Sequence, residues 1–380
     1  MSSSVLTERL ADAGIDPFHG RLGSDYPYRM VLPGVPEIGY HVHLNPFNGS
    51  LVACLRYLEL GAYVGRRGTY DYLEAITGAA FRRFWNRDDG GNVDLMYLAP
   101  EPYRRAFRAL GLAFRVVPDT DRPAMVAAVK ESIAQGKPVL AFGIVGPPEC
   151  GLVTGYDAEG DVLIGRSYFS DETQPAAPHG GYYERDLWFE RMGRGWGGGL
   201  IVLGEKATQP SEREILRETL DWAIQLARTP RRTQRPNHSC GLIAYEDWAT
   251  ALEVDADYPA EERHTMTTRT MVHADQVTML CERRSAARYL RSLIDVASEQ
   301  AFEQLFAAAT LYDQVADFEQ RLWPWGHSMG PEVGEALVRR DVRLALAREV
   351  LRAAAREVRA VEHLERARAV LRSGGLVGEV

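Results

Sequence analysis

One stretch of the chain, residues 128–169, constrains the possible fold more than any other. It predicts a helix, then a continuously apolar strand over 138–144, and then a loop with two consecutive prolines. Two further strands are predicted over 150–156 and 162–168, separated by the turn sequence Asp-Ala-Glu-Gly-Asp. Strands joined by a short turn pair antiparallel, so this stretch predicts an antiparallel sheet.

The length of 380 residues favours two domains rather than one. Residues 1–35 form a polar lead-in, and residues 36–207 combine helices with the strands described above. From 208 to 380 strand formers are few, and helices are expected over 211–228, 241–253, 275–309 and 331–372. The predicted fold class is therefore α+β, with a central antiparallel sheet in the first domain and an all-α C-terminal domain.

The charge and hydropathy of the chain exclude several kinds of partner. A net charge of -8 and a pI near 5.7 argue against nucleic acid, because phosphate binding needs a basic surface. No apolar run reaches the ~18–20 residues that span a bilayer, and the N-terminal residues lack a secretory pattern. The four cysteines show neither metal-binding nor disulfide spacing. We therefore expect a cytoplasmic protein with reduced thiols, no membrane contact and no cofactor.

A short strand is predicted over residues 38–44. It would place His41 and His43 on one face, together with Asn45 if the strand continues that far. Two imidazoles in this arrangement can bind zinc or iron, and Glu149 could add a carboxylate ligand. Alternatively, they are polar residues on the solvent side of an edge strand. We assign His41, His43 and Asn45 to substrate binding and assign no metal ligands.

The next segment leads into an apolar helix over residues 51–64. Backbone N–H groups at the start of a helix favour an anion or an oxyanion, so Phe47 and Asn48 are expected to line a substrate pocket. Ser50 could act as a nucleophile here. Alternatively, the role of Ser50 is structural, because Ser50 or Asn48 would make a suitable N-cap for the helix.

Three motifs within residues 40–170 resemble those of the papain-like cysteine peptidase superfamily. The helix SLVACLRYLEL (50–60) resembles the nucleophile-bearing helix, GKPVL (136–140) resembles a strand of the family, and LVTGYD (152–157) resembles the strand that begins with the catalytic His. Their order is similar to that in double-glycine leader peptidases and, more closely, in the N-terminal domain of butirosin biosynthesis protein H, an acyltransferase relative. In butirosin-type proteins an all-helical region also follows. The resemblance implies a papain-like domain, acyl-transfer or hydrolysis chemistry, and a role in secondary metabolism.

The chain departs from this family at the catalytic positions. When Ser50 and Leu51 are aligned with the small-Leu pair of the family, Pro46 takes the position of the nucleophilic Cys. Glu149 takes the position of the general-base His, and residues 165–167 replace the acid or amide that orients it. A papain-type mechanism needs a thiolate beside an imidazole, so ordinary cysteine-protease activity is not predicted.

Glu149 and Cys150 lie where the proline loop becomes a strand. A carboxylate at the rim of an apolar sheet is partly desolvated, which suits it to acid–base chemistry, and the adjacent thiol is a candidate nucleophile. Side chains alternate along a strand, so at most one of the two faces a pocket. The alternative interpretation is a solvated Glu149 and a Cys150 that packs as a small hydrophobe.

A glycine-bearing loop provides three more candidates for substrate binding, Trp85, Arg87 and Asp88. An aromatic ring, a cation and an acid on one turn can bind a polar small molecule or a metal. Solvated loop charges are an equally simple interpretation.

We therefore predict an enzyme that acts on an amide- or acyl-bearing small metabolite, with Glu149, Cys150 and Ser50 as catalytic residues. One alternative is a catalytically degenerate papain-like module, a pseudoenzyme that binds a peptide or a metabolite. A second alternative is a metal-dependent enzyme with His and carboxylate ligands. The predicted partner is a small-molecule or peptide substrate. A carrier protein is an alternative partner, and the helical domain is an alternative surface for forming a homo-oligomer.

Overall fold

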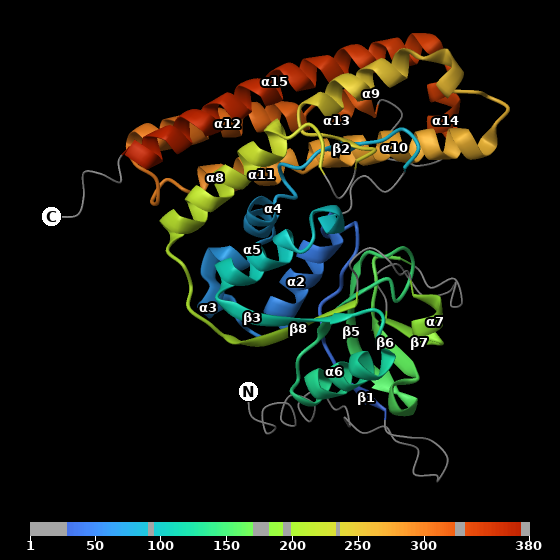
Figure 1. Ribbon diagram of the computed structural model, residues 1–380, viewed down its shortest axis with the longest axis vertical. Coiled ribbons are helices and arrows are strands. Elements are labelled where there is room, and N and C mark those ends of the chain that lie inside the picture. The colour runs from blue at the N-terminus through green and yellow to red at the C-terminus, as the bar shows by residue number, and fades with distance from the viewer. Residues whose placement is uncertain are drawn as a thin grey trace. The chain divides into compact units, whose positions relative to one another are not determined.

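The computed structural model describes residues 29–89, 95–169, 182–192, 199–232, 236–323 and 331–373. The chain forms two compact units, whose elements are labelled in Figure 1. The first comprises Met1–Leu73 and Leu98–Gln209, and the second comprises Glu74–Tyr97 and Pro210–Val380. The predicted domains are each continuous in sequence, so the structure differs from them at residues 74–97, which belong to the second, helical unit.

The first unit is built around an antiparallel sheet, which confirms this part of the predicted fold class. Its strands follow the order β3-β8-β4-β5-β6-β7, and the short β1 pairs with β5. The predicted hairpin is present, since Tyr156 of β5 lies opposite Leu163 of β6. The strands are β1 (Met30–Val31), β3 (Leu112–Pro118), β4 (Val139–Phe142), β5 (Cys150–Asp157), β6 (Val162–Arg166), β7 (Tyr182–Asp186) and β8 (Gly199–Lys206).

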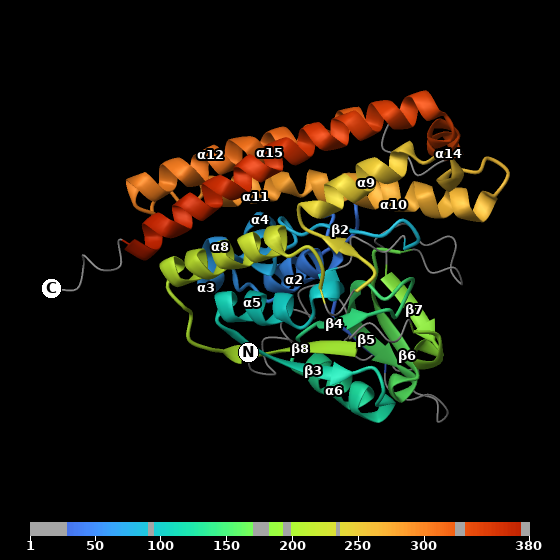
Figure 2. The same ribbon diagram turned by 45° about the horizontal axis from the view of Figure 1, so that its top comes forward.

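Helices cover both faces of this sheet. Figures 1 and 2 show α6 on one side of β3 and β8, with α2 and α5 on the other. Every residue of β4 is buried, as expected for a strand covered on both faces. The helices of this unit are α2 (Pro46–Tyr57), α3 (Gly61–Val64), η1 (Gly65–Gly68), α5 (Glu101–Leu110), α6 (Arg122–Ala134), η3 (Ala158–Gly160) and α7 (Trp188–Arg191), with η2 (Leu95–Leu98) and α4 (Tyr70–Thr77) at the boundaries of the two units.

The predicted strand over residues 38–44 is wrong. The backbone N–H groups of Val42 and His43 both donate to the carbonyl of Gly39, at 2.9 and 3.0 Å. These bonds close a turn, and the alternation of side chains in the sequence therefore does not correspond to a paired strand.

The second unit is helical, in agreement with the predicted C-terminal helical region. Its longest helix, α15, packs against α8, α9 and α12. A two-stranded ribbon pairs Phe84 and Trp85 of β2 with Cys240 and Ser239 of β9. The elements are α8 (Glu212–Arg228), β2 (Phe84–Trp85), β9 (Ser239–Cys240), α9 (Ile243–Glu253), η4 (Asp255–Asp257), α10 (Arg263–Cys281), α11 (Arg283–Arg291), α12 (Glu299–Ala316), α13 (Glu319–Leu322), α14 (Pro331–Val338) and α15 (Arg340–Ser373).

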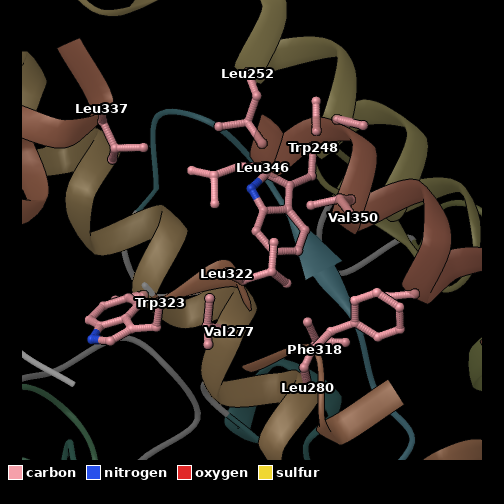
Figure 3. Close-up of a cluster of buried hydrophobic side chains, with 14 of the residues drawn as sticks. Trp248, Leu252, Val277, Leu280, Phe318, Leu322, Trp323, Leu337, Leu346 and Val350 are labelled. Carbon is pink, nitrogen blue, oxygen red and sulfur yellow. The ribbon is translucent and has the colours of Figure 1, made fainter. Parts of the chain in front are cut away.

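Apolar side chains from these helices form a continuous core (Figure 3). Trp248 of α9 lies at its centre, close to Leu346 and Val350 of α15. Trp85 of the β2 ribbon also packs against this cluster. Among the helices of the described ranges, none is both long enough and apolar enough to cross a membrane.

Candidate functional site

The first turn of α2 packs against the start of β5. Helix α2 begins at Pro46, and its N-cap is Asn45, whose side chain accepts a hydrogen bond from the backbone N–H of Asn48 at 3.1 Å. The phenol oxygen of Tyr70 accepts a second hydrogen bond, from the Asn45 N–H at 2.8 Å. The prediction that Asn48 or Ser50 caps this helix is therefore wrong, because the helix begins before both of them.

The two candidate nucleophiles at this junction are buried. The Ser50 hydroxyl donates to the backbone carbonyl of Cys150 at 3.3 Å, and the Ser50 side chain has no exposed surface. Cys150 is only 3% exposed. Both residues are predicted from the sequence to be catalytic, and the structure brings them together, but as buried packing partners.

Glu149, one residue before the buried Cys150, lies at the surface and is half-buried. Its carboxylate accepts a hydrogen bond from the Tyr40 hydroxyl at 2.7 Å. The Tyr40 ring is 43% exposed and packs edge-on against Tyr168, with 5.1 Å between ring centroids. Tyr40 is not among the site residues predicted from the sequence, because no pattern in the sequence links positions 40 and 149.

Gly49 allows Tyr168 to approach the first turn of α2 closely. A Cβ atom at Gly49 would lie 1.9 Å from the Tyr168 hydroxyl and 3.1 Å from Cβ of His43. Any larger residue at position 49 would therefore displace Tyr168, whose ring supports Tyr40. The sequence feature that could have indicated this close approach is a glycine in the first turn of a helix, where a side chain is normally tolerated.

His43 and His41 have different surroundings. The His43 ring stacks on Tyr70 with 4.2 Å between centroids, and burial lowers the pKa of His43, with a further lowering by the nearby Arg56 cation. His41 is exposed, and its Nε2 lies 3.6 Å from a carboxylate oxygen of Glu37. Nowhere in the described part of the chain do three His, Cys, Asp or Glu side chains cluster closely enough to hold a metal ion.

Phe47 and Asn48 are buried in the first unit. The Phe47 ring, 3% exposed, packs against Tyr103 with 4.8 Å between centroids. Asn48 is fully buried beneath the N-cap. Both residues thus support the start of α2 from inside, and neither presents a side chain to solvent.

Trp85, Arg87 and Asp88 belong to the second unit. Arg87 donates to Asp257 at 2.8 Å and to Asp88 at 3.4 Å. Trp85 and Arg87 line a small pocket together with residues of α9 and α10. The predicted binding residues are thus divided between a surface of the first unit and a pocket of the second.

Burial keeps the thiols of Cys54 and Cys240 protonated. Cys54 lies within α2, and its burial raises the pKa of the thiol. Burial also raises the pKa of Cys240, in β9, to about 11. A thiol needs a lowered pKa to react as a thiolate at neutral pH, so neither residue is suited to nucleophilic chemistry. No protein-family model matches this chain, and no curated protein matches it either.

Proposed function

We propose that the first unit is a catalytically degenerate papain-like module, which binds a small molecule or peptide bearing an amine or amide N–H group. The ligand binds without forming a covalent bond, at the surface made by Tyr40 and Glu149. One observation carries the proposal: at the α2–β5 junction the hydroxyl of Ser50 is buried on the Cys150 carbonyl, whereas the Tyr40–Glu149 pair is at the surface.

Covalent acyl transfer requires a nucleophile that the substrate can reach. Ser50 and Cys150 have almost no exposed surface. The Glu149 carboxylate can accept hydrogen bonds from a ligand, and a charged acceptor forms stronger bonds than a neutral one. A ligand N–H group is therefore the complement of this carboxylate.

The turn beside Glu149 adds apolar surface. Tyr40 and Val42 are each 43% exposed, and Leu44 is 36% exposed. An aromatic ring with a polar tip suits a ligand that is partly apolar. The expected ligand therefore combines an N–H donor with an apolar side chain.

The arrangement of helix and sheet supports a papain-like origin for this unit. Helix α2 packs on β5 and β4, and its first turn meets the first residue of β5 through the bond from Ser50 to Cys150. The resemblance implies that the family's nucleophile and general base come from these two elements. Pro46 and Glu149 stand at those positions in this chain.

An enzyme that uses Glu149 for acid–base chemistry on an amide- or acyl-bearing metabolite is the second candidate function. Its support is the surface position of the carboxylate and the Tyr40 hydroxyl 2.7 Å away, within range for proton transfer. This function would use the same surface and the same ligand class.

Isothermal titration of the full chain with leucinamide tests the binding proposal. Leucinamide carries an ammonium group, an amide and an apolar side chain. We expect saturable binding at millimolar concentration, weakened about tenfold or more by Glu149→Gln, because a hydrogen bond to a charged group is lost. Tyr40→Phe should weaken binding by a smaller factor.

Glu205→Gln is the matched control, because it removes a carboxylate of the same unit that pairs with Lys137. Binding that Glu149→Gln leaves unchanged would refute the proposal. Hydrolysis of leucine p-nitroanilide that Cys150→Ala abolishes would instead indicate covalent catalysis. Hydrolysis that Glu149→Gln abolishes and Cys150→Ala preserves would favour the acid–base enzyme.

A further inference from the structure

Helix α12 has one face packed within the second unit and an opposite face that carries exposed aromatic side chains. Its buried residues pack against α11 and α15, which lie beside it in Figure 1. On the other face, Phe306 is 50% exposed and Phe302 is half-buried. The two rings are neighbours on the helix surface, with 6.2 Å between their centroids. Adjacent rings on the solvent side of a helix form an apolar patch of the kind that binds another protein.

The charges along this face differ between its two ends. Glu299 and Glu303 are exposed in the N-terminal half of α12. On the C-terminal side of Phe306 lies Arg291 of α11, whose guanidinium carbon is 5.6 Å from the centroid of the Phe306 ring. The Arg291 side chain is 35% exposed and pairs with Asp313 at 2.6 Å. The aromatic patch is therefore flanked by carboxylates at one end and by a partly exposed guanidinium at the other.

This distribution makes the face complementary to a second copy of itself. A rise of about 1.5 Å per residue places Glu303 about 4.5 Å from Phe306 along the helix axis. If two α12 helices cross antiparallel at Phe306, a two-fold axis brings Glu303 of each copy past Phe306 of the other, on the side where Arg291 lies. The guanidinium has five N–H donors, so Arg291 can bind this carboxylate as well as Asp313.

Other occupants of the face fit these charges less well. A parallel pair of α12 helices would place Glu303 beside Glu303, and like charges in an interface repel each other. An anionic membrane surface attracts basic segments, whereas Glu299 and Glu303 lie next to the rings here. A second copy in the antiparallel arrangement supplies an apolar partner for the rings and an opposite charge for both ends.

We propose that this face of α12 is a dimer interface between two copies of the chain. Phe306 packs on Phe306 of the second copy, and Phe302 extends the apolar contact beside it. Glu303 of each copy pairs with Arg291 of the other, so the interface contains the same charge pair twice. The interface belongs to the second unit and is separate from the surface around Tyr40 and Glu149.

Sedimentation velocity of the full chain between about 1 and about 200 µM measures the association, because small interfaces form weak dimers. We expect a concentration-dependent shift from monomer to dimer. Phe306→Glu places a carboxylate at the centre of the interface and should weaken the dimer about a hundredfold or more. Leu351→Glu is the matched control, because Leu351 is an apolar residue of α15 with 46% exposure. It should leave the association unchanged.

Two charge variants test the antiparallel arrangement. In Glu303→Lys the new cation faces Arg291 at both contacts, and in Arg291→Glu the new carboxylate faces Glu303. Each variant by itself should dimerise about tenfold more weakly than the wild type. An equimolar mixture of the two variants places opposite charges at both contacts and should dimerise more tightly than either variant alone. Circular dichroism checks that both variants are folded.

A wild-type chain that stays monomeric up to about 200 µM would overturn the proposal, and this result needs no variant. A dimer whose affinity is the same in a folded Phe306→Glu variant would place the interface elsewhere and would overturn it too. If the mixture of charge variants dimerises no better than the separate variants, the pairing of Glu303 with Arg291 is wrong.

Discussion

At the scale of single residues, the junction of α2 and β5 places two consecutive residues in different surroundings, one at the surface and one buried. Glu149 reaches the surface and pairs with Tyr40, whereas Cys150, the next residue, is buried. Alternation along a strand predicts that two such neighbours point to opposite faces. Which of them reaches the surface depends on the covering helix, because Ser50 of α2 lies over the start of β5.

His273 should make the second unit sensitive to mild acid. Its burial lowers the pKa from the usual 6.5 to about 4. Between these values the unfolded chain binds a proton that the folded chain does not. Stability should therefore fall as the pH decreases from about 6.5 to about 4, by up to about 3 kcal/mol.

Urea unfolding at pH 7 and pH 5 measures this effect. His273→Gln retains a side-chain N–H for the Leu322 carbonyl and cannot titrate, so it should lose less stability between the two pH values than the wild type. His41→Gln, at an exposed position, is the control and should behave like the wild type. An identical pH dependence in the wild type and His273→Gln would show that His273 is not responsible.

At the scale of secondary structure, Asn45 should stabilise the start of α2. Its side chain caps the helix and Pro46 occupies the first helical position, where a missing N–H costs nothing. Asn45→Ala should lower the free energy of unfolding by about 1 kcal/mol, measured by urea denaturation. Asn45→Asp keeps an acceptor oxygen and should retain most of the stability.

The same measurement on Ser211→Ala gives a matched comparison, because Ser211 caps α8 in the second unit through a capping box with Glu214. We expect a similar loss of about 1 kcal/mol. If Asn45→Ala and Asn45→Asp are equally destabilised, the role of Asn45 is not capping.

Some elements that depend on local sequence match the prediction, but the helix expected over 275–309 is wrong, because this span is divided among α10 (Arg263–Cys281), α11 (Arg283–Arg291) and α12 (Glu299–Ala316). The helix expected over 211–228 corresponds to α8 (Glu212–Arg228), and the predicted hairpin corresponds to β5 and β6. Strand β7, with the sequence YYERD, has too little apolar alternation to be recognised, and pairing with β6 makes it a strand. The segment 38–44 shows the reverse case, in which an alternating pattern closes into a turn.

At the scale of the whole molecule, three buried arginines attach residues 80–83 to helices of the second unit that come much later in the chain. Arg82 forms an ion pair with Glu282 at 2.6 Å, and Arg283 pairs with Glu357 at 2.7 Å. Arg283 also donates to the backbone carbonyls of Ala80 and Arg82. Backbone groups of a segment early in the chain are thus satisfied by helices that come about 200 residues later.

The third arginine, Arg83, provides an internal comparison. It is as buried as Arg283, stacks on Tyr245 and donates to the neutral Gln276 at 2.8 Å, but its Nε and Nη2 have no partner among the described residues. Arg283→Met should cost about 3–5 kcal/mol, because it leaves Glu357 as an uncompensated buried charge. Arg83→Met removes an unpaired charge and should cost at least about 2 kcal/mol less.

Urea denaturation followed by tryptophan fluorescence measures both variants. A combined Arg283→Met, Glu357→Met variant should recover much of the loss, because the unpaired carboxylate is then absent as well. Equal destabilisation by Arg83→Met and Arg283→Met would show that the ion pair with Glu357 is not what holds this region.

The sequence by itself determined the mixed α and β fold class, the antiparallel hairpin and the positions of α8 and α9, because these depend on periodicity and turns within a few residues of each other. It also selected Glu149, Ser50 and Cys150 as candidate catalytic residues. Only the tertiary structure decided that Tyr40 pairs with Glu149, that Ser50 is buried on the Cys150 carbonyl, and that Trp85 and Arg87 line a pocket of the helical unit. Each of these depends on partners that are about 100 or more residues apart in the chain, and no local pattern specifies such a pairing.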